Sequence, residues 1–221
     1  MLKRKILILI LLMSGWSYSM AQDSDIGNWM LYLGNKKINE RWNWHNEVQY
    51  RNYNFIGDLS QLLIRTGLGY NLTENNNNFL LGYGYILTQN YVEDSDEKVD
   101  INEHRIFQQF ITKQKIGVVG VQHRYRFEQR FIEGDFRLRF RYFLAINVPL
   151  NNKEVIDKTW YLSAYNEIFL NTEENFFDRD RLYGGLGYRF SPLIRIEAGY
   201  MNQFLNGPNS DQLNMVAFIN F

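Results

Sequence analysis

Hydrophobic and polar residues alternate with a period of two along most of the chain. The alternation is clearest in ten segments of 10 to 15 residues separated by short polar stretches: 41–53, 59–71, 79–91, 103–115, 118–132, 136–149, 160–171, 181–190, 194–205 and 212–221. A period of two is typical of β-strands, and no segment keeps the spacing of an amphipathic helix. Such lengths exceed those of soluble strands, about 5–6 residues, and suit a tilted membrane strand of at least about 9–11. A further candidate strand lies at 28–34.

The two faces of these segments differ in polarity. In the segment 59–71, Leu62, Ile64 and Leu68 share one face, whereas Gln61 and Arg65 share the other. The charged face of all segments together supplies the candidates for a charge network: Glu47, Arg51, Arg65, Arg124, Arg126, Glu128, Arg130, Arg137, Arg139, Arg141, Glu167 and Arg181. So many charges cannot point into a dry core without a severe desolvation penalty. Either they line a wet lumen while the apolar face meets lipid, or they face solvent around an apolar core, as in a soluble lipocalin-like barrel.

The two ends of the chain favour the membrane arrangement. A basic start, an apolar run at 6–13 and small residues up to Ala21 predict a secretory signal peptide over residues 1–21. The apolar run is too short to cross a hydrocarbon core of about 30 Å as a helix. At the other end, an alternating strand closes on the aromatic Phe221. Such a strand behind an export signal is typical of bacterial outer-membrane barrels, and we expect the barrel-assembly machinery and outer-membrane lipids as partners.

These patterns predict an all-β, transmembrane, antiparallel up-and-down β-barrel with a polar charged lumen, formed by one domain over residues 22–221. Because such barrels usually have even strand counts, we expect ten strands, or twelve if one is hidden. With the C-terminus in the periplasm, the acidic stretch 92–102 lies outside the cell. Lysine plus arginine equal aspartate plus glutamate at 24 each, which argues against a nucleic-acid-binding protein. The chain has no cysteine, so disulfides are excluded.

The segments 118–132 and 136–149 predict a hairpin with Glu133 and Gly134 at its tip. This register places Phe131 opposite Phe136, Arg130 opposite Arg137, Glu128 opposite Arg139 and Arg126 opposite Arg141. A slip by one residue would mismatch polarity along the whole ribbon. Adjacent Arg130 and Arg137 require carboxylates, for which Glu128, Glu47 and Glu167 are the candidates. The network is either a structural filling of a narrow lumen or the lining of an anion-selective pore or anion site.

Evidence for catalysis or metal binding is weak. His123 lies on the apolar face, where a lipid-modifying enzyme would need a Ser–His pair, but Ser163 has the opposite parity in its strand. His45, His104 and His123 lack metal-ligand spacing. We therefore expect no catalytic residue, metal or cofactor. Paired glycines, such as Gly185 and Gly187, are expected to make room for bulky lumen side chains or to allow curvature.

Several motifs resemble an uncharacterised Gram-negative family, domain of unknown function 2490. They are the stretches 42–51 (WNWHNEVQYR), 103–109 (EHRIFQQ), 123–130 (HRYRFEQR), 166–169 (NEIF) and 181–188 (RLYGGLGY). The resemblance spans nearly all of the mature chain. It implies an outer-membrane-type β-barrel without a known activity, and it adds Arg105 to the lumen residues. The expected function is thus an outer-membrane barrel with a chiefly structural lumen, or a narrow or gated channel for small anionic solutes. The alternatives are a lipid-modifying enzyme and a soluble periplasmic ligand-binding barrel.

Overall fold

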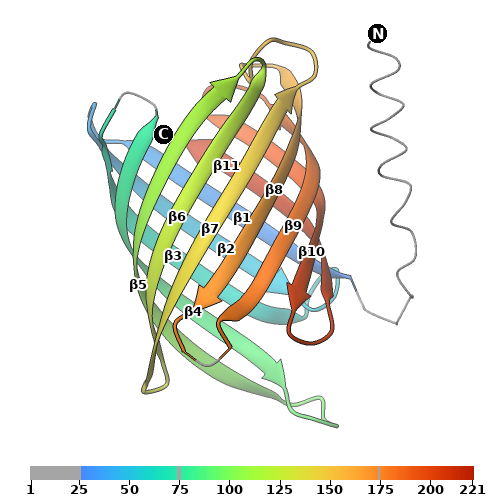
Figure 1. Ribbon diagram of the computed structural model, residues 1–221. Coiled ribbons are helices and arrows are strands. Elements are labelled where there is room, and N and C mark those ends of the chain that lie inside the picture. The colour runs from blue at the N-terminus through green and yellow to red at the C-terminus, as the bar shows by residue number, and fades with distance from the viewer. Residues whose placement is uncertain (1–25, 74–75, 174) are drawn as a thin grey trace.

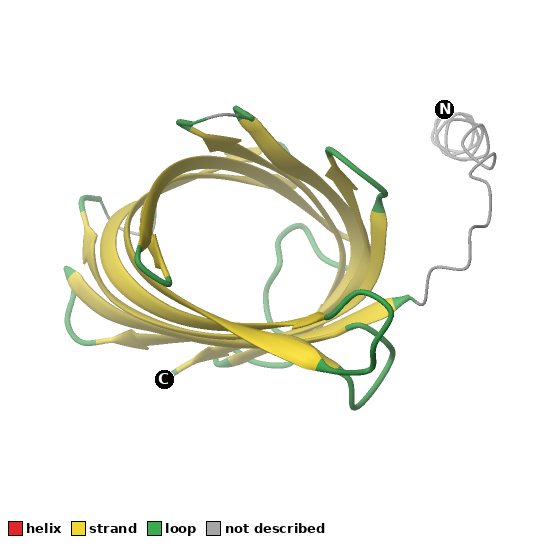
Figure 2. Cartoon of the chain, turned by 90° about the horizontal axis from the view of Figure 1, so that it is seen from below, coloured by secondary structure: helices red, strands yellow, loops and turns green. Residues whose placement is uncertain are grey.

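The computed structural model describes residues 26–73, 76–173 and 175–221, which form a closed β-barrel (Figures 1 and 2). The signal peptide expected at residues 1–21, with cleavage after Ala21, lies outside the described residues. The strands are β1 (Gly27–Lys37), β2 (Trp42–Asn52), β3 (Leu59–Asn71), β4 (Asn77–Tyr91), β5 (Lys98–Ile116), β6 (Val119–Ile132), β7 (Asp135–Pro149), β8 (Thr159–Asn171), β9 (Phe177–Arg189), β10 (Ile194–Leu205) and β11 (Ser210–Asn220). No helix long and apolar enough to cross a membrane occurs among the described residues.

The described residues form eleven strands, one more than the expected count of about ten, for which twelve was the alternative. The surplus segment 28–34 is part of β1, which pairs with β2 on one side and with β11 on the other. Each strand of the meander runs opposite to its predecessor. With eleven strands, the first and last therefore run the same way, and β1 and β11 form a parallel pair. Gly27 and the end of β11 consequently lie at opposite ends of the barrel, which we call the Gly27 end and the Phe221 end.

Side chains on the strands alternate between the lumen and the outer surface. In β3, Leu63 and Arg65 are buried, whereas Ile64 between them is 47% exposed. The same holds around the barrel: large apolar side chains are exposed on the outside, and most buried charged side chains are arginines and glutamates of the lumen. The charged face therefore points inward, and the apolar face points outward. This excludes the arrangement with an apolar core and a charged outer face.

Glycines on the lumen face make room for the largest inward side chains. A Cβ on Gly187 would lie 2.1 Å from the ring of fully buried Tyr161, and one on Gly82 would lie 2.2 Å from the ring of Phe107. The expected role of the paired glycines is thus confirmed at these positions. A barrel wider than about eight strands needs such bulk to fill its interior. Aromatic residues and Met201 fill part of the lumen, and charged residues fill much of the remainder.

Candidate functional site

The hairpin of β6 and β7 positions the centre of the charged lumen. Glu133 and Gly134 at its tip both have positive φ, 48° and 93°, as a two-residue type I′ turn requires. The tip fixes the register, and all four predicted pairs are confirmed, including Glu128 opposite Arg139 and Arg126 opposite Arg141. Local turn geometry and side-chain polarity therefore specify the same pairing.

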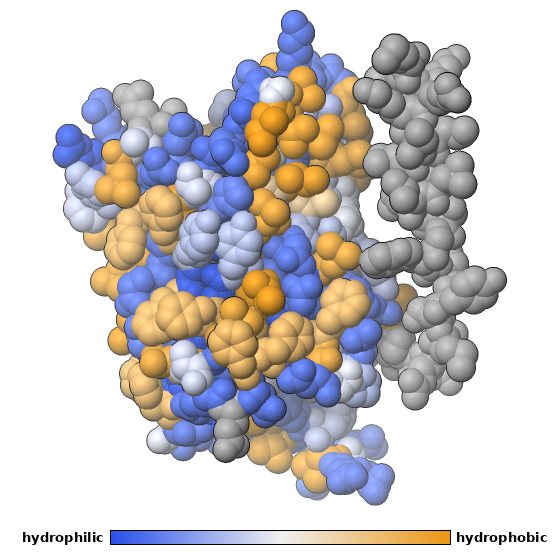
Figure 3. Space-filling model, viewed as in Figure 1, coloured by the Kyte–Doolittle hydropathy of each residue, from blue (hydrophilic) through white to orange (hydrophobic). Residues whose placement is uncertain are grey.

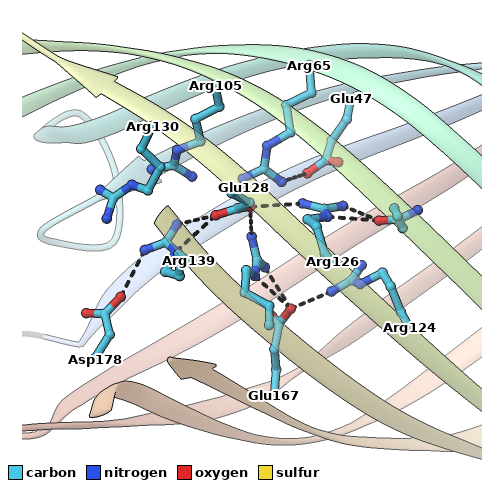
Figure 4. A network of polar contacts seen from close by, with 12 residues as sticks. Glu47, Arg65, Arg105, Arg124, Arg126, Glu128, Arg130, Arg139, Glu167 and Asp178 are labelled. Carbon is cyan, nitrogen blue, oxygen red and sulfur yellow. Dashed lines mark hydrogen bonds and ion pairs between the residues drawn. The ribbon is translucent and has the colours of Figure 1, made fainter. Parts of the chain in front are cut away.

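Glu128 is the central acceptor of this region (Figure 4). Its side chain is fully buried, and its Oε2 accepts hydrogen bonds from Arg139 Nε at 2.9 Å and Nη2 at 2.6 Å. Its Oε1 accepts a hydrogen bond from Arg141 Nη1 at 2.7 Å and lies 3.6 Å from Arg126 Nη1. Three arginines thus converge on one carboxylate, and such charge-assisted, partly bidentate contacts are the strong class of hydrogen bond.

Glu167 on β8 continues the chain of contacts. Its Oε1 accepts a hydrogen bond from Arg141 Nη2 at 2.7 Å and one from Arg124 Nη2, also at 2.7 Å. Arg181 Nη1 lies 3.9 Å from the other oxygen. Arg139 donates through Nη1 to Asp178 Oδ2 at 2.9 Å, which links the group to the start of β9. These contacts connect four consecutive strands across the lumen.

Arg130 and Arg137 do not find the expected carboxylates. Arg130 shares Glu103 of β5 with Arg105: its Nε and Nη2 donate to the two oxygens at 2.6 and 2.9 Å. Arg137 bonds to Asp135 instead, and its side chain is 53% exposed. Arg137, which was expected in the lumen charge network, does not take part in these buried ion pairs, because its position near the hairpin tip leaves it in solvent. Arg105, which the family resemblance adds to the lumen residues, is buried, with 6% of its surface exposed.

A third group lies on β2 and β3. Arg65 Nη1 donates to Glu47 Oε1 at 2.9 Å. Arg51 donates to amide oxygens: through Nε to Gln49 at 3.1 Å and through Nη1 to Gln61 at 2.6 Å. The Arg51 guanidinium also lies 3.7 Å from the ring centre of Trp29. Arg51 forms no ion pair with a carboxylate of the described residues, although it is only 7% exposed.

Together these side chains form what we call the lumen network, with ten arginines and five carboxylates. The arginines are Arg51, Arg65, Arg105, Arg124, Arg126, Arg130, Arg139, Arg141, Arg179 and Arg181, and the carboxylates are Glu47, Glu103, Glu128, Glu167 and Asp178. Arginines therefore outnumber carboxylates two to one. The lumen network thus carries an excess of positive charge, and any function proposed for the lumen must explain this excess.

The sequence reasoning missed Glu103, Asp178 and Arg179. Glu103 begins a segment in which Ile106 and Phe107 are both apolar, so the alternation does not reveal which face is inward. Asp178 and Arg179 precede the predicted segment 181–190, whereas β9 already begins at Phe177. The alternation of acid and base from Asp178 to Arg181 was the available signal.

The histidines take different positions. His123 faces outward, where its Nδ1 lies 2.8 Å from the Tyr142 hydroxyl and its Nε2 lies 3.2 Å from Gln114. Ser163 is buried on the lumen face of β8, so it cannot pair with His123. His45 Nε2 lies 3.3 Å from Glu47 in the lumen. No group of three or more histidine or acidic side chains that could hold a metal occurs in the described part of the chain.

Comparison with known proteins places the chain in a family. A family model described as "Protein of unknown function (DUF2490)" matches residues 26–214. Neither the curated proteins nor the solved structures contain a match to the chain. The matched range runs from the start of β1 into β11 and includes the whole lumen network, so the resemblance expected from the motifs is confirmed. The chain belongs to DUF2490, a family of uncharacterised proteins whose model here covers a closed β-barrel.

Proposed function

We propose that the protein is an integral outer-membrane β-barrel. The observation that carries the proposal is the polarity of the barrel: large apolar side chains face outward on the strands, and the space-filling view shows them over much of the visible wall (Figure 3). Leu81 and Phe140, for example, are 53% and 51% exposed. Soluble monomers rarely expose contiguous apolar patches larger than a few hundred Å². An outward apolar band around a polar interior is the pattern of transmembrane barrels.

Strand length supports the same proposal. The strands have 11 to 19 residues, and a tilted transmembrane strand needs about 9–11. In this proposal the outer-membrane lipids contact the apolar wall, and the assembly machinery recognises β11, which ends next to Phe221. The C-terminus then lies in the periplasm, and the Gly27 end, which includes the turn 92–97, lies outside the cell.

Fractionation and gel migration test this proposal. We expect the protein in the outer-membrane fraction, and we expect unboiled protein in mild detergent to migrate differently from boiled protein. Recovery in the soluble periplasmic fraction without a heat-dependent shift would instead favour a soluble ligand-binding barrel. An epitope inserted at Gly207, in the turn before β11, is expected to be accessible on intact cells, whereas one at Asn152 is not.

In this proposal the lumen network is chiefly structural, because it ties strands together across the interior. A narrow or gated channel for small anionic solutes is a second candidate, and the excess of arginine favours it. Planar-bilayer conductance distinguishes the two. A structural lumen predicts that wild type and Arg139→Glu are both silent, whereas a channel predicts anion-selective current in wild type that the variant loses or reverses in selectivity.

The proposal assigns no catalytic role to His123, whose polar neighbours on the outer wall are Tyr142 and Gln114. We expect His123→Ala to leave growth and lipid composition of the outer membrane unchanged. A change in phospholipid or lipopolysaccharide structure that depends on His123 would revive the lipid-modifying alternative.

A further inference from the structure

The lumen contains a cavity of about 230 Å³ toward the Gly27 end. Eight arginines of the lumen network line it, but Glu103 is the one carboxylate among the lining residues. One water occupies about 30 Å³ of liquid, so the cavity has room for an anion of the size of phosphate together with a few waters. Its lining therefore has a large local excess of positive charge.

The carboxylates next to the cavity are already shared between several cations. Glu103 accepts hydrogen bonds from both Arg105 and Arg130. Glu128 and Glu167 each serve more than one arginine, as described above. These carboxylates therefore do not compensate the remaining arginine charges in the cavity wall. Burial of an uncompensated cation is unfavourable, since its hydration is lost without an equivalent partner.

Arg51 and Arg181 are the cations with the least compensation. The bonds of Arg51 go to neutral amide oxygens, and Arg181 Nε donates to Gln203 at 2.8 Å. The carboxylate oxygen nearest to Arg181 is 3.9 Å away. Both guanidinium groups lie over the ring of Trp29, at 3.7 and 4.9 Å from its centre, and both line the cavity. The indole thus orients two buried cations that come from opposite ends of the sequence.

We infer that this cavity binds a phosphate group, either as free phosphate or as the phosphate of a lipid. The planar guanidinium fork matches phosphate oxygens bidentately, and a dianion compensates two arginines at once. Chloride offers neither the geometry nor the charge. The inference deepens the proposed function by naming the anion class of the lumen. Binding by the folded barrel in detergent does not depend on its location in the cell, so failure here leaves the membrane proposal untouched.

The test uses the full mature chain, folded in a neutral detergent and titrated with inorganic phosphate at constant ionic strength. We expect saturable 1:1 binding by calorimetry and a phosphate-dependent rise in melting temperature that chloride does not produce. Arg51→Gln and Arg181→Gln are each expected to weaken binding about ten- to a hundredfold, as expected for losing a hydrogen bond to a charged group. Arg137→Gln, outside the cavity, is the matched control and should bind like wild type.

The melting temperature in phosphate-free buffer distinguishes an arginine that binds phosphate from one that only stabilises the fold. If Arg51 is an uncompensated cation, Arg51→Gln should melt at the same or a higher temperature than wild type in phosphate-free buffer, and phosphate should no longer raise it. A structural role predicts a lower melting temperature and an unchanged response to phosphate. Should Arg51→Gln not fold, the wild-type and Arg181→Gln titrations still decide the question.

A second arm identifies the source of the phosphate. Monomeric dihexanoyl phosphatidic acid is titrated against the same protein, with dihexanoyl phosphatidylcholine as the control for the acyl chains. Tighter binding of phosphatidic acid than of inorganic phosphate indicates a lipid ligand, and the reverse indicates a solute. Absence of saturable binding of both to the folded wild-type barrel, or binding that neither arginine variant weakens, would overturn the inference.

Discussion

Removal of the Glu128 charge is expected to destabilise the barrel strongly. In Glu128→Gln the side chain keeps its shape and one acceptor oxygen, but the fully buried carboxylate that serves Arg139 and Arg141 is lost. Arg139 keeps Asp178 and Arg141 keeps Glu167, whereas Arg126 loses the one carboxylate with which it forms an ion pair in the described structure. The variant therefore adds one positive charge to a lumen network that already has an excess.

The size of the effect follows from burial. Removing one partner of a buried ion pair costs about 3–5 kcal/mol, because the other charge stays buried without compensation. The control is Asp135→Asn, which removes the pair with Arg137. Both side chains of that pair are more than half exposed, at 53% and 56%, so its loss should cost about 0–1 kcal/mol.

Urea unfolding of the detergent-folded barrel, followed by tryptophan fluorescence, measures both variants. With a slope of about 2–3 kcal/mol/M, Glu128→Gln should lower the midpoint by about 1–2.5 M, and Asp135→Asn by less than about 0.5 M. Equal midpoints for Glu128→Gln and wild type, with unchanged slopes, would refute the assignment of Glu128 as the central counter-ion. A larger effect of Asp135→Asn than of Glu128→Gln would do the same.

Two further predictions concern packing and pH. Gly187→Ala should cost about 1–3 kcal/mol because its Cβ would overlap the buried Tyr161 ring, whereas Gly184→Ala, with open space at its Cβ, should stay within about 0.5 kcal/mol in the same urea assay. At the turn between β2 and β3, burial alone would raise the pKa of the Asp58 carboxyl. Hydrogen bonds, including one from Lys98, and the positive charge of Lys98 together lower this pKa by more than burial raises it, so it lies below its usual 3.8. A depressed pKa stabilises the folded state above about pH 4 and ceases to do so as the pH falls through the folded-state value. The difference in melting temperature between wild type and Asp58→Asn should therefore be present at pH 6 and shrink toward pH 2; a difference that grows on acidification would contradict the pairing.

The sequence predicted the barrel and the polarity of most strands, because one face of each is charged and the other apolar. The β6–β7 register was predictable in detail, since a turn with Gly134 and two matching side-chain patterns constrain it together. The strand count was not predictable in the same way. In β1, Trp29 and Leu31 face inward while Met30 and Tyr32 between them are also apolar or aromatic, so no alternation marks it as a barrel strand.

The carboxylates that pair with the arginines were harder to predict from the sequence. Cross-strand neighbours such as Glu128 and Arg139 follow from hairpin register, which is local. The contact between Arg139 and Asp178 instead joins residues 39 positions apart and depends on where β9 begins. Arg130 pairs with Glu103 because of the register between β5 and β6. That register was not predictable from the sequence, because β5 has apolar residues on both faces. Long-range charge pairing thus requires the closed barrel itself.

The central claim is that lipid meets the apolar wall while the charged face encloses the lumen, and spin labelling in a bilayer tests it most directly. The chain has no cysteine, so single-cysteine variants carry one label each. Labels at Phe140 and Leu144, on the outer face of β7, should be accessible to membrane-dissolved oxygen and shielded from a water-soluble nickel complex. A label at Ala145, which faces the lumen, should show low accessibility to oxygen. High nickel accessibility at both outer positions, or oxygen accessibility without alternation along β7, would contradict the account.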